Sequence, residues 1–138
     1  MNLSKFIFTI ILLNVLSQNV HSQVNQDAIG LHPKTAEYAL EVFGDVTQYQ
    51  TTEFLVKYSE RIRRVSIENL ASDANQYPSL ETVGLRAKYN PNLTVDNENF
   101  DPLNFNPLKY HFAFRKEEIQ KFRVGNTGYV IVISPYKQ

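Results

Sequence analysis

Apolar residues in the first half of the chain recur with the spacing of α-helices. From Lys34 to Phe43 they fill one broad arc of a helical projection, and charged residues fill the remainder. Pro33 suits the first position of that helix, and Gly44 suits its end. A second, longer helix is predicted over roughly Gln50–Ala71, because its large apolar residues again share one face. The pattern therefore predicts two amphipathic helices.

The second half of the chain changes to a period of two, which is typical of half-buried strands. This alternation predicts strands over Val83–Tyr89 and Leu108–Arg115. Two further strands, Gln120–Val124 and Tyr129–Ile133, flank a hairpin loop at Gly125–Gly128. The last strand is apolar on both faces, so we expect it to be central. The whole pattern predicts an α+β fold, with two helices packed on a three- to four-stranded antiparallel sheet.

An Asn- and Pro-rich segment, Asn90–Pro107, interrupts the predicted strands. Proline breaks strand ladders and asparagine favours turns, so we expect an irregular loop here. Loops of this length are uncommon inside compact domains and are often functional. Phe100, Leu103 and Phe105 are too apolar for a solvated linker. They either fold back onto the core or anchor a protein partner.

The N-terminal residues have the three parts of a secretory signal peptide. Lys5 precedes an apolar core, Phe6–Leu16, and polar residues follow that core. The apolar core is too short to cross about 30 Å of hydrocarbon as a helix. We therefore expect residues 1–22 to be a cleaved signal peptide and the rest of the chain to be exported.

Size, charge and cysteine content limit what the exported part could do. We expect 23–32 to be a flexible leader and 33–138 to be a single domain that contains the 90–107 loop. Basic and acidic residues number 14 each, so general nucleic-acid binding and electrostatic membrane binding are not expected. Cysteine is absent, which excludes disulfides, thiol catalysis and lipidation on a cysteine.

Candidate catalytic and metal-binding residues are few. His32 and His111 stand alone, and the spacings of zinc sites, nucleophile elbows and phosphate loops do not occur. Residues 96–101 alternate acids as a calcium loop does, but Asp101 replaces its glycine and Pro107 its final glutamate. We therefore predict no catalytic residue, no metal and no cofactor, and a protein that is not an enzyme.

An arginine cluster in the second predicted helix raises the question of anion binding. Arg61, Arg63 and Arg64 lie close together in the sequence. Acidic residues are interleaved with them, so a solvated helix face with ion pairs is the favoured interpretation.

Two stretches near the C-terminus, Phe105–Tyr110 and Gly128–Ile133, resemble small uncharacterised exported proteins of Bacteroidota-type bacteria. The resemblance implies a cell-envelope setting and carries no catalytic residue. We therefore expect a non-catalytic accessory or protein-interaction domain that is periplasmic, held at the outer membrane through a partner, or secreted. Its expected partner is another envelope protein. The alternative is a small-ligand-binding module, with Tyr89, Tyr110 and Phe112 lining a pocket between the sheet and the long loop.

Overall fold

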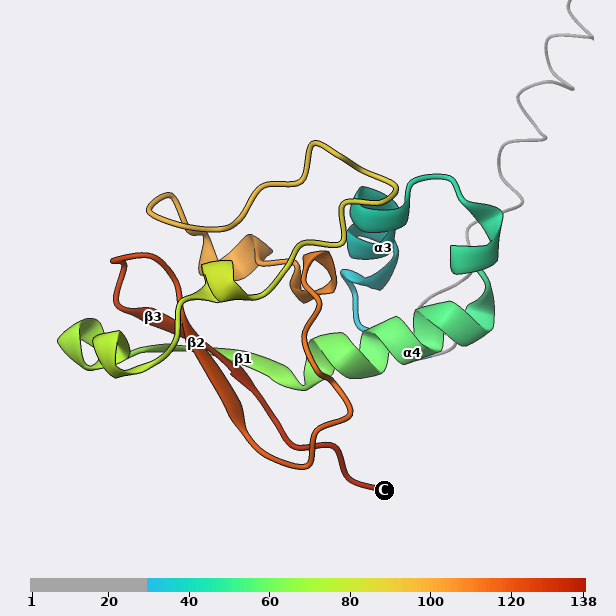
Figure 1. Cartoon of the computed structure of the whole chain (residues 1–138). Coiled ribbons are helices and arrows are strands. Elements are labelled where there is room, and N and C mark those ends of the chain that lie inside the picture. Colours follow the sequence, from blue (N-terminus) through green and yellow to red (C-terminus); the bar gives the residue numbers. More distant parts are fainter. Residues whose placement is uncertain (1–29) are drawn as a thin grey trace, which may run out of the picture. The chain divides into compact units, whose positions relative to one another are not determined.

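The computed structural model describes residues 30–138, so the predicted signal peptide and most of the predicted leader lie outside the described residues. A compact unit runs from Leu31 to Gln138 and combines helices with an antiparallel sheet, which makes it α+β (Figure 1). Leu31 is buried, and the His32 N–H donates to Ser59 Oγ at 2.7 Å. Packing therefore begins before Pro33. Within residues 30–138, the helices are too short or too polar to cross a membrane.

The two predicted helices are present, and the first is confirmed apart from its start, because Lys34 is the N-cap and Pro33 precedes it. Helix α3, Thr35–Phe43, buries one face and ends at Gly44, whose N–H donates to Leu40 O at 2.8 Å. Gly44 has a φ of 57°, a conformation that favours glycine. Helix α4, Thr52–Arg63, packs against α3.

The predicted second helix is wrong beyond Arg63. Residues Val65–Asn69 form strand β1 instead. A helical projection could not separate the two outcomes, because Ile62 and Val65 are three positions apart and share a helical face. Val65 and Ile67 are β-branched, and they pair with Ile133 and Ile131 of the last strand. Pairing with that distant strand outweighs the weak helical preference of this segment.

The C-terminal hairpin and its central strand are confirmed. Strand β2, Gln120–Arg123, and strand β3, Tyr129–Ile133, are antiparallel, and the sheet order is β1-β3-β2. Gly128 has a φ of 80°, and a Cβ there would lie 3.0 Å from Ala71 Cα. The glycine is therefore required both by the turn and by the close approach of the chain.

Two predicted strands, Val83–Tyr89 and Leu108–Arg115, are wrong as strands. They meet only at an isolated bridge between Leu85 and Tyr110, and the His111 N–H donates to Gly84 O at 2.8 Å. The in-and-out alternation of the second segment holds from Tyr110 to Arg115, whereas Lys109 is buried. Its alternate apolar side chains are buried: Leu108, Tyr110, Phe112 and Phe114. In this segment, the alternation of apolar and polar residues therefore indicated which side chains are buried, and not that the backbone pairs in a sheet.

Irregular segments and short 3₁₀-helices, and not α3 and α4, cover the two faces of the sheet. Leu80, Phe105 and Tyr110 belong to the same buried cluster as Ile131 and Ile133 of β3. On the opposite face of the sheet, Val130 and Val132 pack with Ala74, from a short 3₁₀-helix at Ala71–Gln76. The helices pack in a separate cluster, together with Leu93 and Leu108 and without the buried residues of β3, so the expected packing of two helices on a sheet face is wrong. In Figure 1, α4 leads directly into the start of β1.

The predicted irregular loop at 90–107 is confirmed, and it folds back onto the core. Phe105 is only 5% exposed. The Tyr110 hydroxyl donates to Asp96 Oδ2 at 2.6 Å and accepts from the Asp96 N–H at 2.8 Å. Lys109 Nζ lies 3.0 Å from the same carboxylate oxygen. Burial, followed by the bond to Asp96, raises the pKa of Tyr110, so its hydroxyl stays protonated and clamps the loop.

Candidate functional site: a cationic aromatic pocket

A cavity of about 390 Å³ lies between α4 and the 85–89 segment, and we call it the cationic pocket. Aromatic and cationic side chains make up most of its wall. None of the described residues that line it carries a carboxylate. Its lining comprises Phe43, Tyr49, Phe54, Lys57, Tyr58, Arg61, Leu85, Arg86, Ala87, Lys88, Tyr89 and His111.

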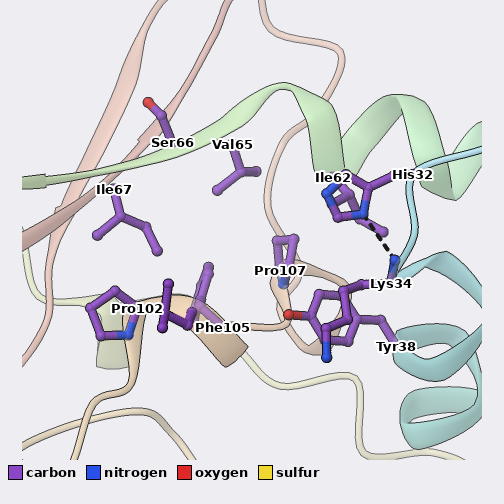
Figure 2. Close-up of a pocket in the computed structure, with 11 residues that line it drawn as sticks. His32, Lys34, Tyr38, Ile62, Val65, Ser66, Ile67, Pro102, Phe105 and Pro107 are labelled. Atoms are coloured by element: carbon purple, nitrogen blue, oxygen red, sulfur yellow. Dashed lines mark hydrogen bonds between the residues drawn. The ribbon is translucent and has the colours of Figure 1, made fainter.

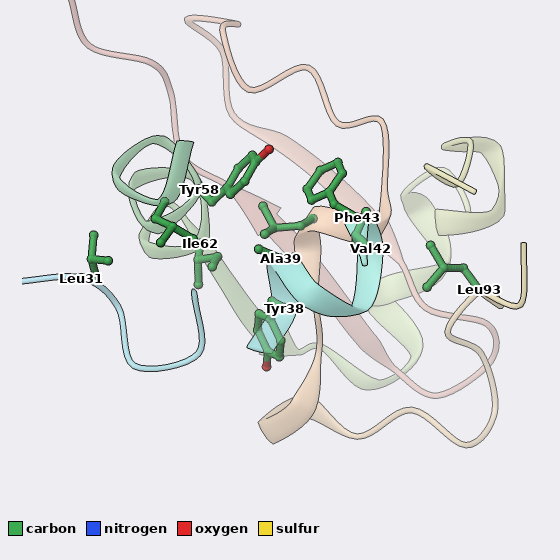
Figure 3. Packing of buried hydrophobic residues seen from close by; sticks show 10 residues of the cluster. Leu31, Tyr38, Ala39, Val42, Phe43, Tyr58, Ile62 and Leu93 are labelled. Carbon is green, nitrogen blue, oxygen red and sulfur yellow. The ribbon is translucent and has the colours of Figure 1, made fainter. Parts of the chain in front are cut away.

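The aromatic wall of the cationic pocket is a set of rings in mutual contact. Phe43 stacks on Tyr49 with ring centroids 4.8 Å apart and on Tyr58 at 5.1 Å. Phe54 meets Tyr49 edge-on at 5.5 Å. Phe43 comes from α3 and Tyr58 from α4, and both belong to the buried helical cluster shown in Figure 3. The rings are thus held by the core at fixed angles to one another, between 14° and 76° for these three contacts.

Four cations surround these rings, and two of them are held by direct contacts. Arg86 Nε donates to the backbone carbonyl of Tyr110 at 3.0 Å. The Arg61 guanidinium lies 5.3 Å from the centre of the Phe114 ring. Phe54, Lys57, Tyr58 and Arg61 recur on one side of α4 with helical spacing, which is why one helix supplies both rings and charges.

The pKa values of Arg61 and Arg86 are both lowered in the folded protein, so folding disfavours their charged forms. Burial lowers the pKa of Arg61, and the neighbouring charges of Arg86 and Arg115 lower it further, whereas Tyr58 and Glu60 raise it. Burial also lowers the pKa of Arg86. Guanidinium groups nevertheless remain protonated, so the fold retains two charges that it disfavours. An anion placed between them would relieve that cost.

Tyrosine hydroxyls supply the neutral polar groups of the cationic pocket. Burial raises the pKa of Tyr58 to about 12, although Arg61 favours its ionised form, so it remains a hydrogen-bond donor at neutral pH. The Tyr49 and Tyr89 hydroxyls lie 3.0 Å apart. Their hydrogen bond raises the pKa of Tyr49 and lowers that of Tyr89, and Lys88 lowers the latter further. Either hydroxyl can be the donor in this hydrogen bond.

A second cavity of about 320 Å³ runs beside β1, and we call it the β1 groove (Figure 2). Ile62, Val65, Ile67, Pro102 and Phe105 give it a mostly apolar wall, and Leu103 stands at its rim. Two of its polar side chains, those of Lys34 and His32, already have partners within the protein. These contacts are Lys34 Nζ with Glu37 at 3.1 Å, and the Lys34 N–H with His32 Nδ1 at 3.2 Å.

The residues proposed as partner anchors are placed in three different environments. Phe105 is core, and Phe100 is half-buried, with its ring centroid 5.6 Å from that of Phe105 and 5.4 Å from that of Tyr129. Leu103 is 86% exposed. Of the three, only Leu103 offers a largely free side chain.

The residues proposed for a ligand site are also divided. Tyr89 lines the cationic pocket, whereas Tyr110 and Phe112 are buried in the cluster beneath the sheet. The predicted pocket position, between sheet and loop, therefore differs from that of the cationic pocket. Sequence reasoning missed Arg86, which lies within the segment predicted as a strand, Val83–Tyr89. It also placed Arg61 on a solvated face, because acidic residues are interleaved with the arginines in the sequence. In the structure, Arg61 lines the cationic pocket.

Acidic residues of the 96–101 segment serve the protein itself. Asp96 holds Lys109 and Tyr110, and Asp101 caps the Pro102–Asn104 turn by accepting from the Leu103 N–H at 3.0 Å. The side chain of Asn104 and then that N–H lower the pKa of Asp101. Within residues 30–138, no group of three or more His, Asp or Glu side chains is placed to hold a metal ion.

Comparison of the chain with protein-family models, with curated proteins and with solved structures found no match in any of the three.

Proposed function

We propose that this protein is an exported module that binds a small organic anion in the cationic pocket. One observation carries the proposal: four cationic side chains and five aromatic rings line a single cavity, and none of the described lining residues is acidic. The chain as a whole has a formal net charge of zero, so this local excess is not a consequence of a basic composition. The ligand we expect combines an anionic group with a planar apolar body.

The contacts around the two arginines support an anionic ligand. Arg86 donates to a neutral backbone carbonyl, and Arg61 faces an aromatic ring, so neither contact neutralises a charge. A carboxylate matches the planar fork of a guanidinium and would form charge-assisted hydrogen bonds. The cavity volume of about 390 Å³ lies within the range of small-molecule sites.

Binding of simple aromatic carboxylates would test the proposal. We expect benzoate and larger aryl carboxylates to bind in calorimetric titrations at low salt. Arg61→Gln and Arg86→Gln should each weaken binding by about tenfold or more, since a hydrogen bond to a charged group contributes about 1.5–3 kcal/mol. Arg123→Gln is the matched control, because it removes the same charge from a residue that does not line the cationic pocket.

Two results would contradict this function. One is that no carboxylate in the series binds to the folded wild-type protein. The other is that Arg61→Gln, Arg86→Gln and the control Arg123→Gln bind the probe equally well.

The export half of the proposal is supported by the N-terminal sequence, in which Lys5 precedes the apolar core Phe6–Leu16. Expression with the native N-terminus in a bacterium that has a periplasm would test it. We expect the protein in the envelope or medium fraction, with a new N-terminus at Gln23 by Edman sequencing. Protein that stays in the cytoplasm and retains Met1 would contradict export.

A role in protein interaction is the second candidate function, and the exposure of Leu103 favours it. This side chain is 86% exposed beside the mostly apolar β1 groove. The expected partner is another protein of the cell envelope. In cross-linking of intact cells, Leu103→Ser should remove a specific adduct that the control Ile119→Ser retains, since Ile119 is also exposed but does not line the β1 groove. An unchanged adduct pattern in Leu103→Ser would count against this surface.

A further inference from the structure

The cationic pocket has two positively charged ends. If the proposed function holds, this arrangement specifies the class of ligand more closely. At one end, Arg61 and Arg86 both act on the pKa of Tyr58. At the other end, Lys88 lies 5.0 Å from the centre of the Tyr89 ring, and it acts on the pKa values of both Tyr89 and Tyr49. The charges are therefore grouped around different tyrosines.

The α4 helix carries one cation at each of these ends. Lys57 lies 6.0 Å from the centre of the Phe54 ring, near the start of α4, where Phe54 contacts Tyr49. Arg61 follows four residues later, which places it about 6 Å further along the helix axis. The 85–89 segment repeats the order, with Lys88 near Tyr89 and Arg86 near Tyr58. Each end of the cationic pocket thus has one cation from each wall.

Aromatic side chains occupy the wall between the two ends. Phe43 stacks on both Tyr49 and Tyr58, and Phe54 contacts both of these tyrosines as well, at 5.5 and 5.9 Å between ring centroids. A flat ring of the ligand would pack against this surface, while the charged groups at its two edges would meet the cations. A ligand with one charge would leave the second pair of cations without a counterion.

We infer that the ligand of the cationic pocket is a dianion whose two acidic groups are held about 6 Å apart by a planar apolar linker. The carboxylates of a 1,4-disubstituted benzene ring have this spacing. The inner group lies between Arg61 and Arg86, where charge is desolvated. The outer group lies near Lys57 and Lys88, whose side chains are exposed.

Three probes of nearly equal shape test this inference by calorimetry: benzene-1,4-dicarboxylate, its monomethyl ester and benzoate. We expect the dicarboxylate to bind about fivefold more tightly than either monoanion, because exposed ion pairs contribute modestly. Benzene-1,2-dicarboxylate has the same charge with the wrong spacing, and it should bind no better than benzoate.

The variants separate this inference from the proposed function. Lys57→Gln/Lys88→Gln should bring the affinity ratio of dicarboxylate to benzoate down to about one, whereas Arg86→Gln should weaken both probes. Both lysines are exposed, so a matching thermal midpoint will show that the double variant is folded. If benzoate binds in an Arg86-dependent manner but the monomethyl ester binds as tightly as the diacid, the dianion inference is wrong and the function stands. If no probe binds, both are wrong.

Discussion

The two cavities of this protein are similar in size and opposite in construction. The cationic pocket has about 390 Å³ and the β1 groove about 320 Å³, so volume alone does not separate them. In the β1 groove, the charge of Lys34 is matched by Glu37, and His32 accepts a backbone hydrogen bond. In the cationic pocket, Arg61 contacts the Phe114 ring and Arg86 contacts the Tyr110 carbonyl, and both of these groups are neutral. An uncompensated charge distinguishes the better candidate for a ligand site.

The two cavities share Tyr110 as a structural support, although it lines neither of them. Its carbonyl accepts the hydrogen bond from Arg86 of the cationic pocket. Its ring stacks on Phe105 of the β1 groove, with centroids 5.8 Å apart. Variants at the shared residue should affect the whole domain, whereas variants at one cavity should leave the other unchanged.

The largest expected effect is the loss of this shared support. Tyr110→Ala should lower the free energy of unfolding by about 3–5 kcal/mol, because the side chain is fully buried and its removal leaves a void. Urea denaturation followed by circular dichroism measures this change. The exposed control Ile119→Ala should change it by no more than about 0.5 kcal/mol.

A milder variant covers the case in which Tyr110→Ala does not fold. Tyr110→Phe keeps the ring but removes the hydroxyl that bonds Asp96, and we expect a loss of about 1–3 kcal/mol. A Tyr110→Phe protein as stable as the wild type would show that this hydroxyl does not clamp the 90–107 loop.

Removing one charge from each cavity should change stability in opposite directions. Arg61→Gln should leave the free energy of unfolding unchanged or raise it, by no more than about 1 kcal/mol, because partial exposure screens the cost that burial and Arg86 impose. Lys34→Gln should lower it by up to about 0.5 kcal/mol, since the pair with Glu37 is exposed. Both are measured by urea denaturation at low salt. A clear loss of stability in Arg61→Gln would mean that its charge is compensated after all.

The β1 groove should respond to pH through His32. Burial and then Arg63 lower the pKa of His32 from its ordinary 6.5, so the unfolded chain binds a proton more readily than the folded one. The free energy of unfolding should therefore be greatest above pH 6.5 and fall as the pH drops below it. His32→Gln should flatten this dependence in thermal unfolding scans between pH 5 and 8, whereas the exposed His111→Gln should not.

The smallest expected effect belongs to the rim of the β1 groove. Leu103→Ser should change the free energy of unfolding by less than about 0.5 kcal/mol, because the side chain has little buried area to lose. It should also leave carboxylate binding in the cationic pocket unaffected. A loss of several kcal/mol would place Leu103 in the core and remove it as a candidate anchor.

Local signals allowed part of the fold to be predicted from the sequence. The first helix has its own start and stop residues, and the 120–133 hairpin joins strands that are neighbours in sequence. Strand β1 could not be recognised in the same way, because its partner β3 lies more than sixty residues further along the chain. A window around Val65 contains no information about that partner.

The candidate site was harder to predict than the fold. Tyr89 was identified because aromatic residues are natural pocket walls. Arg61 was assigned to a solvated face because helical spacing shows only which side chains share a face of their own helix. It does not show which face another segment of the chain covers. The 85–89 segment that closes over it is irregular, and Arg86 is fixed by its backbone bond to Lys109 O and its side-chain bond to Tyr110 O. Sequence periodicity has no signature for a wall built from such a segment.

The position of β3 in the sheet also determines when the sheet can form. Among the residues that the structure describes, strands β1 and β2 do not pair with each other. Both pair with β3, which occupies residues 129–133, and β2 has one further isolated bridge, between Arg123 and Ser79. As the chain emerges during synthesis, the helical cluster gains most of its residues early, whereas β1 waits for residues 129–133. A nascent chain that lacks β3 therefore leaves β1 and β2 without their pairing partner. It also leaves the apolar side chains that would pack against the finished sheet exposed. For this protein, sheet formation is a late event in synthesis, set by topology and not by the strength of the strands.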